Sequence, residues 1–150
     1  MASANQFKLE FKSRPENVGF ARVVVAAFAT QIDFTLSDVE DIKGAISEAV
    51  TNAVIHGYGN DPDGTITIHG AIYDGQLEVI VEDHGVGIEN IPQALQPGFS
   101  TVPDRLGLGF SFMQSFMDTI EVRSQPGRGT RVIMTKRVPR RADHAEQGLS

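Results

Sequence analysis

The first part of the chain has the hydrophobic and polar pattern of a strand followed by a helix. From Phe7 to Lys12 apolar and charged residues alternate, which is typical of a half-buried strand. Ser13 and Glu16 have the spacing of a capping box, so we expect a helix to begin there, with Gly19 costing it about 1 kcal/mol relative to alanine. The apolar stripe of this helix is Val18, Ala21, Val25, Phe28, Ala29 and Ile32.

A second helix is predicted to begin at a capping box that starts with Ser37 and to end at Gly57. Along it Glu48, Asn52 and His56 recur every four residues, so they share one stripe of the helix. The opposite stripe is apolar and consists of Ile42, Ala45, Ile46, Ala49, Val50 and Ala53. A carboxylate, an amide and an imidazole aligned beside a core indicate a functional site.

Four further strands are predicted as two hairpins. Asp74-Gly75 is a strong turn signal in the first hairpin, and the segment from Pro126 to Gly129 turns the second. The predicted strands are Thr65–Tyr73, Gln76–Glu82, Ile120–Ser124 and Thr130–Lys136.

Between the hairpins lies a long segment with little regular pattern, from Ile88 to Leu106. A loop of this length in a compact domain is usually functional, often as a lid over a ligand. A further helix is expected from Gly107 to Asp118. Its predicted buried side is Phe112, Met113, Phe116 and Met117.

This order of elements predicts an α+β fold. We expect a two-layer sandwich in which a mixed, mostly antiparallel sheet is covered on one face by about three helices. A chain of 150 residues with 41% hydrophobic content fits one domain, assigned to residues 1–138. Residues 139–150 are polar and are predicted to be a disordered tail.

Charge and composition exclude several classes of function. The formal net charge is −6, and four basic residues gather near the C-terminus, so the rest of the chain is more acidic still, which argues against direct nucleic-acid binding. The chain has no cysteine and no apolar run of the roughly twenty residues that a membrane span needs. We therefore expect a cytoplasmic protein that binds neither nucleic acid nor membrane.

Two glycine-containing motifs are candidates for nucleotide binding. At the end of a strand, Asp83 can accept a hydrogen bond from an exocyclic amine, while Gly85 and Gly87 let the backbone pass close to a flat ring. At a helix N-terminus, Gly107 and Gly109 present free N–H groups to phosphate oxygens. Each motif alone is weak, because such residues are common in turns.

The helix stripe supplies two more groups. Asn52 offers an amide oxygen suited to Mg²⁺, whose other ligands would be phosphate and water. Glu48, one turn earlier, can act as a general base toward a hydroxyl group. Either residue alone would more often be an ordinary surface side chain. The hypothesis of a nucleotide site therefore depends on finding these two groups and both glycine-containing motifs in one small domain.

The order and spacing of these motifs resemble the GHKL, or Bergerat, ATP-binding superfamily of gyrase-type ATPases and histidine kinases. The boxes are Glu48-x-x-x-Asn52-x-x-x-His56, Asp83-x-Gly85-x-Gly87, Gly107-x-Gly109 and Gly127-Arg128-Gly129-Thr130, within residues 35–137. Within the superfamily the chain is most similar to the sporulation anti-sigma factors, which are serine protein kinases. The stretches Phe20–Phe28, Ile46–Tyr58 and Phe116–Asp118 carry that similarity, over residues 5–137.

The resemblance implies ATP or ADP and Mg²⁺ as ligands. Asp83 would bind the adenine amine with help from Thr130, Gly85 and Gly87 would shape the purine pocket, and Asn52 would hold Mg²⁺.

For phosphoryl transfer, the resemblance assigns Gly107, Leu108 and Gly109 to the phosphate cradle. It places Arg105 near the terminal phosphate, and it implies that Glu48 takes the proton from the acceptor serine. His56 is not assigned a catalytic role, because near a helix C-terminus it can cap carbonyl groups.

The implied function is a partner switch. As an ATP-bound homodimer, such a protein holds a sporulation sigma factor and phosphorylates a serine of an anti-anti-sigma antagonist, with Arg22 as a partner contact. Alternatives are a stress-response anti-sigma kinase of the same family and a nucleotide-gated binding module without turnover. A histidine-kinase catalytic domain fits less well, because one strand and one helix precede residue 35 in place of a helical dimerisation segment.

Overall fold

The computed structural model describes residues 5–87 and 106–139. The elements are β1 (Asn5–Lys12), α1 (Glu16–Ala29), α2 (Leu36–Asn52), the π-helical turn η1 (Ala53–Gly57), β2 (Thr65–Tyr73), β3 (Gln76–Asp83), α4 (Leu106–Phe116), β4 (Thr119–Gln125) and β5 (Gly129–Arg137). The predicted lid, residues 88–105, and residues 140–150 of the predicted tail lie outside the described residues. Within the described ranges, no helix is both long and apolar enough to cross a membrane.

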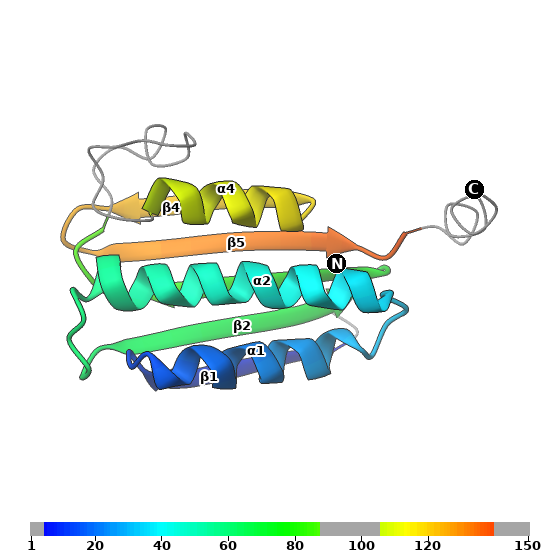
Figure 1. Ribbon diagram of the computed structural model, residues 1–150, viewed down its shortest axis with the longest axis horizontal. Helices are drawn as coiled ribbons and strands as arrows, with labels where there is room; N and C mark the ends of the chain where they lie inside the picture. The colour runs from blue at the N-terminus through cyan, green and yellow to red at the C-terminus, as the bar shows by residue number, and fades with distance from the viewer. Residues whose placement is uncertain (1–4, 88–105, 140–150) are drawn as a thin grey trace.

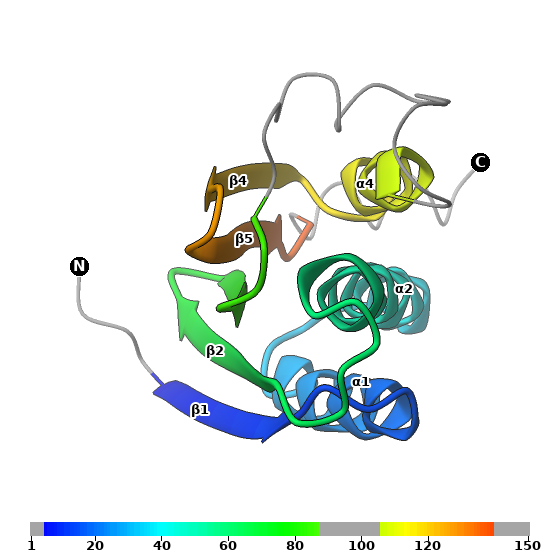
Figure 2. The same cartoon turned by 90° about the vertical axis from the view of Figure 1, so that its left-hand side faces the viewer.

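The predicted two-layer α+β architecture is confirmed. Five strands form one sheet in the order β1-β2-β3-β5-β4, and α1, α2 and α4 cover one face of it (Figures 1 and 2). All the strand pairs described are antiparallel, so the expected mixed sheet is wrong in that detail. The helix α2 lies between α1 and α4, over the middle of the sheet (Figure 2).

Both predicted hairpins are present. Asp74 and Gly75 have φ angles of 52° and 70°, the left-handed pair that a two-residue hairpin turn requires. Every second residue of the central strands points to the helices, as Val79 and Val81 do on β3 and Met134 does on β5. These side chains meet the apolar faces of α1, α2 and α4 in one core.

Both predicted N-caps are wrong. The N-cap of α2 is Thr35, not Ser37: Thr35 Oγ1 accepts from Asp38 N at 3.1 Å, and Asp38 Oδ2 accepts from Thr35 N at 3.0 Å. Ser13 does not cap α1; it is buried, and its hydroxyl donates to the carbonyl oxygen of Asp61. A capping pattern identifies residues able to cap, but a tertiary acceptor can take the same hydroxyl.

The end of the second helix also differs from the prediction. The helix continues to Gly57, but its last five residues form a π-helical turn, in which Tyr58 N donates to Ala53 O at 3.0 Å. The repeat of 3.6 residues that aligns Glu48 with Asn52 therefore does not continue to His56. Gly57 is a helical residue here, not a left-handed cap.

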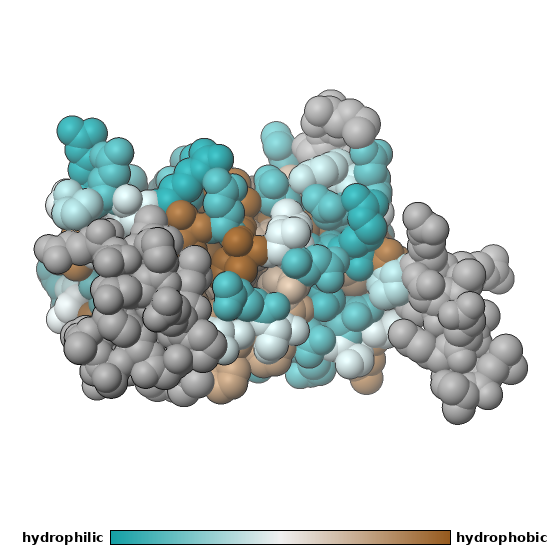
Figure 3. Space-filling view, turned by 90° about the horizontal axis from the view of Figure 1, so that it is seen from above, coloured by the Kyte–Doolittle hydropathy of each residue, from teal (hydrophilic) through white to brown (hydrophobic). Residues whose placement is uncertain are grey.

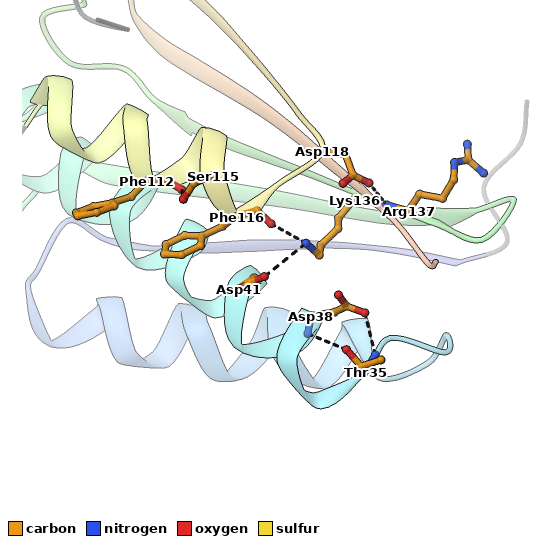
Figure 4. Close-up of polar contacts among 9 residues, drawn as sticks. All are labelled: Thr35, Asp38, Asp41, Phe112, Ser115, Phe116, Asp118, Lys136 and Arg137. Carbon is orange, nitrogen blue, oxygen red and sulfur yellow. Dashed lines mark hydrogen bonds and ion pairs between the residues drawn. The ribbon is translucent and has the colours of Figure 1, made fainter. Parts of the chain in front are cut away.

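On α4 the predicted buried side is partly wrong. Met113 and Met117 are buried and Phe116 is half-buried, but Phe112 is 37% exposed and Phe110 takes the core position. Phe112 instead stacks on Phe116, with ring centroids 6.2 Å apart (Figure 4). Seen from the α4 and β4 side, hydrophobic surface lies among hydrophilic side chains (Figure 3).

The C-terminal end of α4 is fixed to the layers beneath it. Lys136 is nearly buried, and its Nζ donates to the Phe116 carbonyl oxygen at 2.7 Å and lies 3.8 Å from Asp41 Oδ2 (Figure 4). Asp118 Oδ2 accepts from Arg137 N at 2.7 Å, which joins the end of the helix to β5. Because these contacts reach α2 and β5, they hold the last turn of α4 in place.

Two glycines inside helices offer a test of this packing. A Cβ at Gly19 of α1 would have no atom within 4 Å, whereas a Cβ at Gly44 of α2 would lie 2.7 Å from Phe116 Cε2. We expect Gly19→Ala to raise the free energy of unfolding by about 0.5–1 kcal/mol through helix propensity. Gly44→Ala gains the same helix propensity but overpacks the contact with α4. Its free energy of unfolding should therefore be about 1–2 kcal/mol lower than that of Gly19→Ala.

The measurement is urea unfolding of both variants beside the wild type. Equal stabilisation by the two substitutions would show that α2 and α4 are not in close contact at Gly44.

Candidate functional site

The predicted base and the predicted metal ligand lie together, facing α4. A Cβ added to Gly109 would be 3.0 Å from Asn52 Nδ2 and 3.2 Å from Glu48 Oε2. A side chain at position 109 would therefore fill the space in front of both groups. Gly107 and Leu108 also belong to the first described turn of α4, where backbone N–H groups lack intrahelical acceptors, so the predicted phosphate cradle lies against the polar stripe of α2.

Asn52 is the one unsatisfied polar group of this corner in the described part of the chain. Its side chain is 8% exposed, and Nδ2 has no hydrogen-bond partner there. A buried donor without an acceptor costs about 1–3 kcal/mol, so the position favours an acceptor supplied by a ligand.

The donor set fits a magnesium nucleotide better than a bare metal. No group of three His, Asp or Glu side chains suited to a metal occurs among residues 5–87 and 106–139. A cation at Asn52 would therefore take one amide oxygen from the protein and the rest of its ligands from phosphate and water. Asn52 Nδ2 would then be free to donate to a phosphate oxygen.

Asp83, the predicted adenine acceptor, ends β3 on the face that the helices cover. It is 7% exposed, and its Oδ1 accepts from Gly85 N at 2.9 Å. A Cβ on Gly57 would lie 2.8 Å from Asp83 Cγ, so only glycine at position 57 lets the π-helical turn approach the carboxylate. The sequence pattern predicts a helix cap at Gly57 and carries no signal for this role.

Burial raises the pKa of Asp83 above its ordinary value of 3.8, because desolvation disfavours the charged form. The backbone N–H groups of Gly85 and Thr130 and the neighbouring His84 act in the opposite direction and offset part of this effect. A carboxylate that is desolvated and yet supported by N–H groups is suited to accept a hydrogen bond from a ligand amine.

Residues His84–Gly87, which we call the strap, connect Asp83 to the predicted lid. Val86 N donates to Gly57 O at 2.9 Å, and Val86 O accepts from Gly127 N at 2.7 Å. The strap is therefore attached to η1 on one side and to the turn between β4 and β5 on the other.

The two glycines of the strap are needed for contacts within the protein itself. A Cβ on Gly85 would lie 1.8 Å from Gly57 O, and a Cβ on Gly87, whose φ is 78°, would lie 2.2 Å from Gln125 O. Their predicted role beside a purine ring stays a prediction, since these backbone contacts by themselves require glycine at both positions.

Thr130 lies directly opposite Asp83 in the pairing of β3 with β5, and its predicted role beside the adenine amine stays a prediction. Its hydroxyl lies 2.9 Å from Ser124 Oγ, a neighbour that the sequence analysis did not single out. Both residues line a hollow of about 280 Å³ at the ends of β3, β4 and β5, which Asp83 also lines.

The remaining predicted residues lie elsewhere. Arg22 is half-buried on α1, the helix on the far side of α2 from α4 (Figure 2). His56 is half-buried in the π-helical turn, and Arg105 falls outside the described residues. The structure thus assembles Glu48, Asn52 and Gly109 in one corner.

Residues 11–136 match the histidine kinase-like ATPase domain family. The chain is 47% identical to the anti-sigma F factor of Clostridium novyi over 91% of this chain and 96% of that protein. It is 50% identical to the anti-sigma F factor of Clostridium acetobutylicum, with 89% and 94% of the two chains covered. The corresponding protein of Geobacillus thermodenitrificans is 48% identical, with 89% and 93% covered.

Solved structures share the fold at lower identity. The RsbU and RsbW domains of a Mycobacterium tuberculosis protein match with a TM-score of 0.65 and 23% identity, over 89% of this chain and 32% of that one. A blue-light activated histidine kinase of Erythrobacter litoralis matches with a TM-score of 0.58 and 22% identity, over 74% of this chain and 34% of its own. This chain therefore spans about a third of each of those larger chains.

The motif order, the Glu48–Asn52 corner and these relatives agree, and the family predicted from the sequence is confirmed. The chain belongs to the histidine kinase-like ATPase family and, within it, to the anti-sigma F factors.

Proposed function

We propose that this protein sequesters a sporulation sigma factor and uses Mg-ATP to phosphorylate a serine of the anti-anti-sigma antagonist that competes for it. The observation that carries the kinase part is the corner of α2 and α4, where Glu48 and Asn52 face the glycine at position 109. The anti-sigma part rests on relatives that are 47% to 50% identical over almost their whole length.

In this proposal the nucleotide lies between α2, α4 and the strap. Asp83 accepts a hydrogen bond from the adenine amine, with Thr130 beside it, and Gly85 and Gly87 border the base. The phosphates approach the N-terminal turn of α4, where the N–H groups and the helix dipole favour negative charge. The phosphate cradle is Gly107, Leu108 and Gly109, and Arg105 would face the terminal phosphate.

Magnesium, when bound, neutralises phosphate charge, and Asn52 is the residue that would hold it through its amide oxygen. The buried Nδ2 of the same side chain then donates to a phosphate oxygen. Asn52 thus orients the phosphates against Gly109, the residue that leaves room for them.

In the proposal Glu48 acts as the general base. Its carboxylate takes the proton of the acceptor serine as the serine oxygen bonds to the γ-phosphorus and the bond to the β–γ bridging oxygen breaks, which releases ADP. Because the transferring group moves between two oxygens held in line, positioning and charge stabilisation supply most of the catalysis. A compact domain can therefore suffice.

The partner switch follows from the kinase reaction. Phosphorylation lowers the affinity of the antagonist and returns the protein, as a homodimer, to the sigma factor. Arg22 on α1 would contact the partners, at a distance from the chemistry on the other side of α2. This function operates in the cytoplasm, where RNA polymerase and its sigma factors are found.

Replacement of Glu48 tests the kinase chemistry. With γ-labelled Mg-ATP and the antagonist protein, we expect acid-stable, alkali-labile label, and Glu48→Gln should slow its appearance by about 10²- to 10⁴-fold because the base is lost. ATP affinity should change little, since Glu48 acts on the acceptor serine. Glu40→Gln on the exposed face of the same helix is the matched control and should keep the wild-type rate.

Transfer that survives Glu48→Gln would remove Glu48 as the base. ATP binding without any label in the wild type would leave a nucleotide-gated binding module, and acid-labile label would indicate histidine-kinase chemistry.

The raised pKa of Asp83 predicts how stability depends on pH. Because folding raises this pKa, the folded protein binds the proton more tightly than the unfolded chain does, and the stability from this group is lost as pH rises through the raised pKa. The free energy of unfolding of the wild type minus that of Asp83→Asn should therefore be larger at about pH 4 than at about pH 7.5. Urea unfolding without nucleotide measures both values.

The same titration of Asp83 should change the affinity for ATP. Protonated Asp83 cannot accept from the adenine amine, so ATP affinity should fall as the pH falls through the raised pKa, and Asp83→Asn should bind ATP at least about tenfold more weakly at neutral pH. A pH-independent difference in stability, together with unchanged ATP binding, would contradict the assignment of Asp83.

A further inference from the structure

Tyr58 follows the π-helical turn and reaches the strap with its hydroxyl group. Tyr58 Oη accepts from the backbone N–H of His84 at 2.7 Å and donates to the carbonyl oxygen of Thr65 at 2.6 Å. One hydroxyl thus connects the end of the site helix, the start of β2 and the residue that follows Asp83.

The aromatic ring of Tyr58 has a fixed place. A Cβ on Gly64 would lie 2.6 Å from Tyr58 Cγ and 2.8 Å from Ser13 Oγ, so the ring packs directly against the backbone before β2. Ser13 N donates to Gly64 O at 2.9 Å and holds that backbone from the other side. The hydroxyl is therefore presented to the strap by a ring with little freedom to move.

Three successive N–H groups of the strap have defined acceptors. His84 N donates to Tyr58 Oη, Gly85 N to Asp83 Oδ1, and Val86 N to Gly57 O. The neighbours Gly57 and Tyr58 supply two of the three acceptors. Because the Gly85 bond ends on the Asp83 carboxylate itself, a rotation of the strap acts directly on that carboxylate.

We propose that Tyr58 is a positioning residue that sets the direction of the Asp83 carboxylate and so determines the preference for adenine. The inference rests on the proposed nucleotide site and adds to it a residue that does not touch the nucleotide. A hydrogen bond prefers an angle above about 150° and weakens steeply below about 120°, so a rotation of the strap that turns the carboxylate beyond this range costs the bond to the amine but not the contacts to the phosphates.

The test compares two nucleotides that differ only at the amine. ATP and purine riboside triphosphate, which has hydrogen in place of the exocyclic amine, are titrated into the wild type and into Tyr58→Phe with Mg²⁺ present. The wild type should prefer ATP. Tyr58→Phe should bind ATP about three- to tenfold more weakly and bind the purine analogue with unchanged affinity, so that the preference for adenine shrinks.

Tyr73→Phe is the matched control. Tyr73 Oη also makes hydrogen bonds, accepting from Gln76 Nε2 at 3.0 Å and lying 3.3 Å from Glu78 Oε2, but at the opposite end of β3 from Asp83. This control should leave both affinities as they are in the wild type. Amide hydrogen exchange without nucleotide gives a second readout, and the His84 amide should exchange faster in Tyr58→Phe and normally in Tyr73→Phe.

Equal weakening of both nucleotides by Tyr58→Phe would overturn the proposal, since it would indicate general loss of structure. So would an unchanged preference for adenine, or an unchanged His84 amide. If the wild type bound neither nucleotide, the proposed nucleotide site itself would fail. If both the wild type and Tyr58→Phe preferred ATP equally, the site would stand and only the role of Tyr58 would fail.

Discussion

The structure of the site depends on the close approach of the π-helical turn to the end of β3. Gly57 lies against the Asp83 carboxylate, and its carbonyl oxygen receives the N–H of Val86 in the strap. The approach is possible only because position 57 and position 85 have no Cβ. An α-helical last turn would place residue 57 differently, so the π turn, the two glycines and the buried carboxylate form a single arrangement.

This arrangement costs stability and prepares the site for a ligand. Asp83 is desolvated, which raises its pKa, and Asn52 holds a buried Nδ2 without a partner among residues 5–87 and 106–139. A domain selected for stability alone would avoid both features. In the proposed complex an amine would donate to Asp83 and a phosphate oxygen would accept from Asn52 Nδ2, which would lower both costs, so the geometry of the unliganded protein fits the proposed nucleotide site.

The helix α4 connects the chemistry to the scaffold. Its first described turn faces Asn52 and Glu48 across Gly109, while its last turn is fixed by Lys136 and Asp118 to the layers below (Figure 4). A helix anchored at one end positions its other end along a defined direction. The predicted phosphate cradle would thus depend on contacts at the far end of α4, about two helical turns from Gly109.

The sequence alone determined the elements, because alternation, helical periodicity and turn residues act over short distances. It therefore predicted both hairpins, the layer order and the pairing of Glu48 with Asn52. Only the tertiary structure decided the roles of Ser13, Gly57 and Tyr58, whose partners lie between 7 and 48 residues away along the chain. Local patterns predict a cap at Ser13 and a helix end at Gly57 and give no role to Tyr58, because the acceptor or neighbour that fixes each role exists only once the layers have packed.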